Sequence, residues 1–151
     1  MAVLRGVDSR RPRGHGGQSL VEFALILPLL ALLLLGSVDL TRAFYYYLAL
    51  QNASRETARV LVDYPSQYDD TAGCTAGHQE SYPIIDVSCG AGTIIIAPAA
   101  NGSANPPLRQ PGHRAITVTA TYAFKPITVL IQWFTGPTLT LRAQTVMLAF
   151  Y

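Results

Sequence analysis

The stretch that decides the fold is GGQSLVEFALILPLLALLLLGSVD, which runs from Gly16 to Asp39. Within it, the 16 residues from Phe23 to Val38 carry no charge. Counted from Gln18 to Val38, the apolar segment would extend roughly 30 Å as an α-helix, which is the thickness of a hydrocarbon core. A core helix of a soluble protein would show a polar stripe, and this segment shows none. The stretch therefore predicts a membrane-spanning helix with a single carboxylate, Glu22, near its start.

Composition and charge agree with a membrane anchor joined to one small domain. Only 13% of the 151 residues are charged, whereas about a quarter is usual in soluble domains. The net charge of +2 is the sum of +3 in the first 17 residues and −1 at Glu22, because the segment from Asp39 to Tyr151 carries seven basic and seven acidic residues. With a single lysine in the chain, the sequence offers no basic face for nucleic acid.

The basic residues ahead of the apolar run predict the topology. Arg5, Arg10, Arg11 and Arg13 favour a cytoplasmic N-terminus under the positive-inside rule. The run is longer than the apolar region of a secretory signal, and no small-x-small cleavage site follows it. The sequence thus predicts four segments: a cytoplasmic basic leader (1–17), a transmembrane helix (18–38), its amphipathic extension (39–62) and an extracytoplasmic β-rich domain (63–151).

The helix is expected to continue past the membrane, from about Ser19 to Val62. Residues at steps of three and four predict one apolar face on this extension. They are Leu40, Phe44, Tyr47, Leu48, Gln51, Ala58, Leu61 and Val62. Asp39 with Arg42, and Glu56 with Arg59, have the spacing of surface ion pairs, each worth a few tenths of a kcal/mol at most.

The remaining chain predicts a small antiparallel sheet. In RAITVTATYAF, apolar residues from Ile116 to Phe124 alternate with threonines and alanine, which indicates a half-buried strand. YPIIDVSC and TIIIAPAA read as brief strands between turns, and TLTLRAQTVMLAFY as the last strand. KPITVLIQWF is a short helix or another strand, and the proline near its start favours the helix. The expected fold class is α+β, with the long helix packed on the sheet.

Two cysteines, Cys74 and Cys89, lie in this outer segment. An even cysteine count in an oxidising compartment favours a disulfide between them. The alternative is two separate buried thiols. His78, four residues after Cys74, makes a thiolate and imidazole metal site conceivable, but structural zinc requires four ligands. We therefore predict a disulfide and no metal.

The residues GGQSLVEFALILPLL resemble the processing site and membrane helix of type IV pilin-like proteins, and more closely the TadE-like group of Tad (tight adherence, Flp-type pilus) systems. The resemblance covers Gly16 to Val62. It implies that a prepilin peptidase cuts after Gly17, so that Gln18 becomes the N-terminus and Glu22 the fifth mature residue. It also implies that Glu22 pairs with the freed α-amine of a neighbouring subunit during assembly. A simpler alternative is that Glu22 snorkels toward the cytoplasmic interface.

The resemblance implies a structural, non-enzymatic role as a membrane-anchored minor pilin or pseudopilin of a Tad-type pilus or secretion apparatus. The implied partners are other pilin-like subunits, the prepilin peptidase, the inner-membrane assembly platform and the bilayer, with no cofactor, nucleic acid or small-molecule substrate. The alternative is an uncleaved signal-anchor protein with an extracytoplasmic binding domain. An anchored enzyme is a third possibility, but the sequence contains no catalytic or phosphate-binding motif that supports it.

Overall fold

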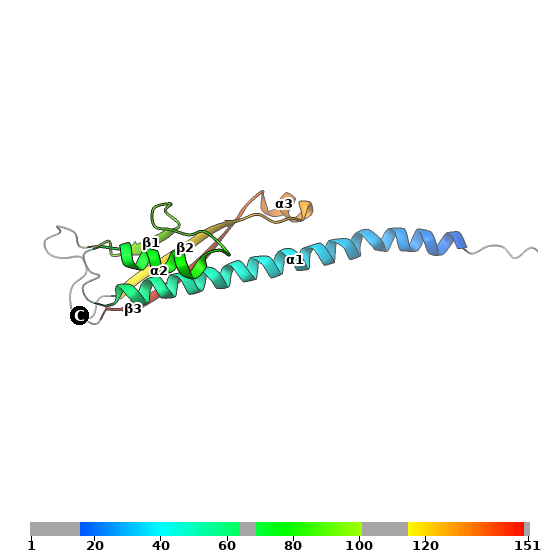
Figure 1. Ribbon diagram of the computed structural model, residues 1–151. Helices are drawn as coiled ribbons and strands as arrows, with labels where there is room; N and C mark the ends of the chain where they lie inside the picture. Colours follow the sequence, from blue (N-terminus) through cyan, green and yellow to red (C-terminus); the bar gives the residue numbers. More distant parts are fainter. Residues whose placement is uncertain (1–15, 64–68, 101–114, 150–151) are drawn as a thin grey trace, which may run out of the picture. The chain divides into compact units, whose positions relative to one another are not determined.

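The computed structural model describes residues 16–63, 69–100 and 115–149 (Figure 1). Its elements are α1 (Gly16–Leu61), α2 (Thr71–Ser81), β1 (Ile94–Ala97), β2 (Ala115–Phe124), α3 (Val129–Thr135) and β3 (Leu139–Leu148). The chain divides into two compact units, one up to Leu34 and the other from Leu35 onward. A long N-terminal helix and a small antiparallel sheet confirm the predicted α+β class. Most of the predicted leader, residues 1–15, lies outside the described residues.

The sheet has the order β1-β2-β3, with both neighbouring pairs antiparallel. β2 is central, and its alternation places Ile116, Val118, Ala120 and Phe124 in the core. The threonine face predicted opposite them is also partly covered, because Thr119 is buried too. The predicted strands ending at Phe124 and in the C-terminal segment are therefore confirmed, as is the short helix between them.

The second part of α1 packs on the sheet through small side chains. Its buried residues are Asp39, Ala49, Leu50, Ala53, Ser54, Thr57, Ala58 and Leu61. The predicted apolar face was wrong over its first turns, because Leu40 and Phe44 are 71% and 61% exposed. This part of α1 carries apolar residues on both sides. Small side chains on its buried side allow the sheet and α2 to approach closely. Hydrophobic periodicity alone could not distinguish the two sides.

Specific side-chain contacts join α1 to the sheet. The Tyr46 ring packs edge-to-face on Tyr122 and Phe124, with ring centroids 5.5 and 5.8 Å away. Further along, the hydroxyls of Ser54 and Thr145 share a 2.8 Å hydrogen bond. Edge-to-face aromatic pairs add about 0.5–1.5 kcal/mol each beyond the apolar area that they bury. These contacts fix the positions of β2 and β3 along the axis of α1.

α2 corrects the prediction that the chain beyond the long helix begins with brief strands joined by turns. Its buried residues, Gly73, Gly77 and Ser81, recur every four positions and form one small-residue face. The space beside Gly73 is occupied by Leu61, and that beside Gly77 by Thr57 and Ala53 of α1, so the two helices run antiparallel in close contact. The predicted strand in YPIIDVSC is absent, since residues 82–89 form turns and irregular chain.

Replacing Gly77 with alanine should lower the free energy of unfolding by about 2 kcal/mol, because overpacking a close contact costs about 1–3 kcal/mol. The added Cβ would clash with Oγ1 of Thr57 and lie 3.2 Å from the Ala53 carbonyl oxygen. Alanine gains about 1 kcal/mol of helix propensity over glycine. The clash is nevertheless expected to dominate, because α1 backbone stands behind it. Chemical denaturation of the full chain in detergent, followed by near-UV circular dichroism, measures the change.

Gly90→Ala is the matched control, because a Cβ there would meet no atom within 4 Å. Thr57→Ala tests the cause, since among the described residues its buried hydroxyl has no hydrogen-bond partner. Combining Thr57→Ala with Gly77→Ala should cost less than the sum of the two single changes. Simple additivity of the two costs would contradict the proposed clash.

Candidate functional site

The first turns of α1 carry the residues that the resemblance singles out. Gly17, Gln18 and Glu22 are all exposed, and a Cβ added to Gly17 would meet no atom within 4 Å. The side-chain amide nitrogen of Gln18, Nε2, donates a 3.1 Å hydrogen bond to Glu22 Oε1, one helical turn away. Residue 18 and the carboxylate therefore lie on the same side of the helix, where an amine at the position of Gln18 would be near Glu22.

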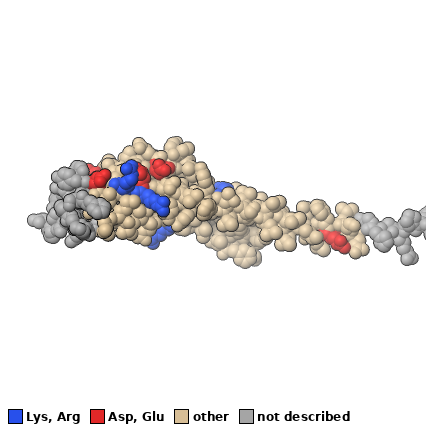
Figure 2. Space-filling model, turned by 90° about the horizontal axis from the view of Figure 1, so that it is seen from below, with Lys and Arg blue, Asp and Glu red and all other residues tan. Residues whose placement is uncertain are grey.

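The segment that follows presents its apolar side chains outward. Among the described residues, α1 is the one helix that is long and apolar enough to cross a membrane, judged by length and composition. Its most apolar 18-residue window has a mean hydropathy of 2.4, and none of that window is buried. Figure 2 shows few charged side chains toward the N-terminal end of α1, whereas blue and red groups gather toward the opposite end. An uncovered apolar helix of this kind is typical of a membrane anchor.

Asp39, which closes the apolar run, is the one buried carboxylate in the described part of the chain. It is 2% exposed, and its two oxygens accept hydrogen bonds from the backbone N–H groups of Ile127 and Thr128, each at 2.8 Å. This carboxylate therefore ties the segment between β2 and β3 to α1. The surface ion pair predicted for Asp39 was wrong in its location, because the carboxylate is buried.

The surroundings of Asp39 favour its charged form. Burial alone would raise the pKa of this carboxyl, but the two backbone donors and the Arg42 guanidinium outweigh it, so the pKa is lowered. Arg42 Nη1 lies 3.4 Å from Asp39 Oδ1, and its guanidinium carbon lies 5.7 and 5.4 Å from the ring centroids of Tyr46 and Phe124. Sequence reasoning named Asp39 only as one partner of a surface ion pair and did not predict its burial or its bonds to Ile127 and Thr128.

A small apolar cavity of about 330 Å³ lies beside Asp39. Gly36, Leu40 and Ala43 line it from α1, and Ile131 and Thr135 line it from α3. Its walls are almost entirely apolar, so it contains no convergent polar groups of the kind that fix a small ligand. The residues that line the cavity show that α3 lies beside the part of α1 from Gly36 to Ala43.

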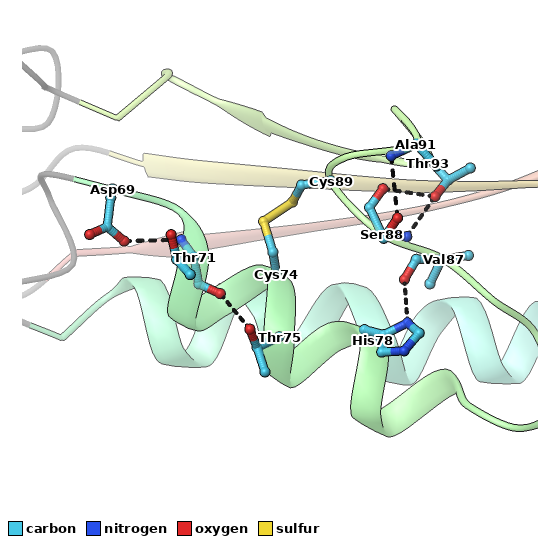
Figure 3. The surroundings of a disulfide bond; sticks show 10 residues. All are labelled: Asp69, Thr71, Cys74, Thr75, His78, Val87, Ser88, Cys89, Ala91 and Thr93. Atoms are coloured by element: carbon cyan, nitrogen blue, oxygen red, sulfur yellow. Dashed lines mark hydrogen bonds between the residues drawn. A yellow bond between two sulfur atoms is a disulfide. The ribbon is translucent and has the colours of Figure 1, made fainter.

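The structure joins Cys74 of α2 to Cys89 by a disulfide, with a Cα–Cα distance of 5.7 Å (Figure 3). Both sulfurs are thus bonded to each other and are not available as thiolate ligands. His78 instead lies with Nδ1 3.2 Å from the carbonyl oxygen of Val87, on the chain leading to Cys89. Within the described ranges, no three His, Cys, Asp or Glu side chains are grouped to hold a metal.

The comparisons with known proteins match the N-terminal part of the chain. The family model described as TadE-like protein matches residues 17–59. That match begins at Gly17 and includes Glu22, Asp39 and most of the part of α1 that packs on the sheet. No curated protein and no solved structure matches the chain.

The family match indicates a role in the assembly of a Tad pilus, together with other pilus components. The family is one of pilus structure and assembly, which agrees with a non-enzymatic protein. One long apolar helix near the N-terminus is consistent with a single-pass membrane protein. The resemblance inferred from the sequence is therefore confirmed over residues 17–59, where this chain is similar to the TadE-like family.

Proposed function

We propose that this chain is a membrane-anchored minor pilin or pseudopilin of a Tad-type pilus or secretion apparatus, cut by a prepilin peptidase after Gly17. The observation that carries the proposal is the family match over residues 17–59, which begins at Gly17, the residue that would precede the proposed cut. In this proposal residues 1–17 form a cytoplasmic leader, residues 18–38 span the membrane, and residues 39–62 extend the helix. Residues 63–151 then form the extracytoplasmic domain.

Glu22 is the proposed assembly residue. An unpaired carboxylate within a membrane costs about 2.5–3.5 kcal/mol on insertion scales, so it requires a partner or a route to water. Cleavage after Gly17 would create an α-amine on Gln18, whose side chain already reaches Glu22 within one chain. We infer that in an assembly the amine of one subunit neutralises Glu22 of the next. The cost of burying Glu22 would then be offset only in correctly packed subunits.

A second feature that supports packing between subunits is the exposed side of α1 beyond the membrane. Leu40, Phe44, Tyr47 and Leu48 lie on it, four apolar or aromatic side chains that the sheet leaves uncovered. Other pilin-like subunits are the partners that such a stripe fits, and the peptidase and the assembly platform are the further proposed partners.

Intact mass and N-terminal sequencing of the protein from its native membrane test the processing step. We expect a mature chain that begins at Gln18, and we expect Gly17→Leu to retain the arginine-rich leader. A wild-type chain that still carries Arg5 to Arg13 would contradict processing and would favour an uncleaved anchor.

Glu22→Ala tests the assembly step separately. We expect this variant to be cleaved and anchored normally but to yield few or no pili, because the amine of the neighbouring subunit loses its partner. Glu56→Ala is the matched control, since Glu56 is a carboxylate of the same helix that pairs with Arg59 outside the apolar run. Normal pili from Glu22→Ala would overturn the charge-pair mechanism and leave processing intact.

A further inference from the structure

α3 and the residue next to its cap present an unusually apolar surface to solvent. Large exposed side chains are contributed by Ile127, Val129, Leu130, Trp133 and Phe134. Trp133 and Phe134 are 79% and 76% exposed and contact each other edge-to-face, with ring centroids 5.4 Å apart. No residue of α3 is buried, and none from Pro126 to Thr138 is charged. A contiguous exposed patch of this kind marks an interaction surface.

The position of α3 along α1 is fixed by contacts within one unit. The backbone of Ile127 and Thr128 is bonded to Asp39, and the cavity joins Ile131 and Thr135 to Gly36 and its neighbours. α3 therefore lies beside the last turn of the apolar run and the first turn after it. If the run spans a bilayer, its end at Val38 is at the boundary between hydrocarbon and water, and α3 is at the same height.

We propose that α3 is a second membrane contact, with Trp133 and Phe134 inserted into the headgroup region of the leaflet at the C-terminal end of the span. The inference rests on the membrane anchoring proposed above. Tryptophan is enriched at this boundary, and interfacial helices bury their apolar face about 5–10 Å deep. Exposed Lys125, next to Pro126, supplies a cation for lipid phosphates.

Lipid is a better occupant than a second protein subunit for a positional reason. Every anchored copy has a bilayer at the height of Val38, whether or not it is assembled, whereas a protein partner is present only in the assembly. A patch with two exposed aromatic rings and no charge would otherwise face water in each unassembled copy. The hydrogen bonds of Asp39 hold the start of α3 at this position along α1. Because Asp39 is buried, its charge does not lie on the outward-facing surface of α3.

Trp133 is the only tryptophan in the chain, so its fluorescence reports directly on α3. The full chain is reconstituted into vesicles of phosphatidylglycerol and phosphatidylcholine, the latter brominated either near the headgroup or near the end of the acyl chain. We expect a blue-shifted emission, loss of most of the intensity with the shallow bromines, less loss with the deep bromines, and little quenching by aqueous iodide.

A control variant separates this inference from the anchoring itself. Leu30→Trp in a Trp133→Phe background places the tryptophan within the apolar run, where bromine must quench it if the run spans the bilayer. If that control is quenched and Trp133 is quenched only by iodide, α3 faces water and the inference is overturned. Emission of Trp133 that neither bromine nor iodide reduces would indicate a protein partner and would also overturn it. An unquenched control would refute the anchor, and the inference with it.

Discussion

Asp39→Ala should lower the free energy of unfolding of the outer domain by about 3 kcal/mol, because removing one partner of a buried charge pair typically costs about 3–5 kcal/mol. The variant removes the acceptor of two backbone N–H groups, one of which belongs to buried Thr128. The lower end of the range is expected because the Arg42 side chain, 33% exposed, remains partly hydrated and keeps its two aromatic neighbours. Chemical denaturation of the full chain in detergent measures the loss.

Glu56→Ala is the matched control for this variant. Glu56 and Arg59 have the same spacing on the same helix as Asp39 and Arg42, but both side chains reach water. Exposed pairs of this kind contribute about 0.3–0.5 kcal/mol. Equal losses from the two alanine variants would contradict a special role for Asp39. Asp39→Asn should fall between them, because an amide retains one acceptor oxygen.

The same interaction gives stability a defined pH dependence. The pKa of Asp39 is lowered in the folded chain from its ordinary value of 3.8. A carboxyl with a depressed pKa stabilises the fold fully above its unfolded value, and this contribution is lost as the pH falls through the folded pKa. Wild-type stability should therefore decrease below pH 3.8 more steeply than that of Asp39→Asn, which lacks this titration. Parallel decreases would assign the acid sensitivity to other carboxyls.

The sequence predicts those parts of the fold that depend on a simple repeat. β2 alternates apolar and polar residues along its length, so its buried face, including Ile116 and Phe124, follows from the side-chain period of a strand. The apolar run predicts a helix because its length and lack of charge leave few alternatives. α3 was predicted with Pro126 in its first turn, and it begins three residues later, at Val129. In each case, local chemistry and tertiary structure favour the same conformation.

The parts that the sequence did not predict are those that depend on tertiary contact. TAGCTAGHQES is rich in residues of low helix propensity, yet it forms α2 because Gly73 and Gly77 allow it to lie against α1. The Gly-xxx-Gly spacing was the available signal for this contact. Asp39 was assigned to the surface because i,i+3 spacing reveals a potential partner on the same helix but not donors about 90 residues away. The buried side of α1 was predicted wrongly for the same reason. Small residues face the sheet and α2, whereas large apolar residues had been expected there.

Removing the disulfide, by Cys74→Ser together with Cys89→Ser, should lower the free energy of unfolding by about 3 kcal/mol, because closing a loop of about 15 residues restricts the unfolded chain by that amount. The bond has a sequence separation of 15 and connects α2 to the turn before β1. That turn has its own hydrogen bonds, including one from the Ser88 N–H to Thr93 Oγ1 at 2.7 Å (Figure 3). The native contacts should therefore survive in the variant.

Denaturation with and without a reductant separates the bond from the serine substitutions. The wild type in reductant should match the double variant, and the double variant should not respond to reductant. Hydrogen exchange should then show the largest loss of protection in α2, because Gly73 and Gly77 supply only small contacts with α1 and the bond supplies the covalent link. A wild type whose stability is unchanged by complete reduction would contradict this account. The packing of α2 on α1 would then be sufficient by itself.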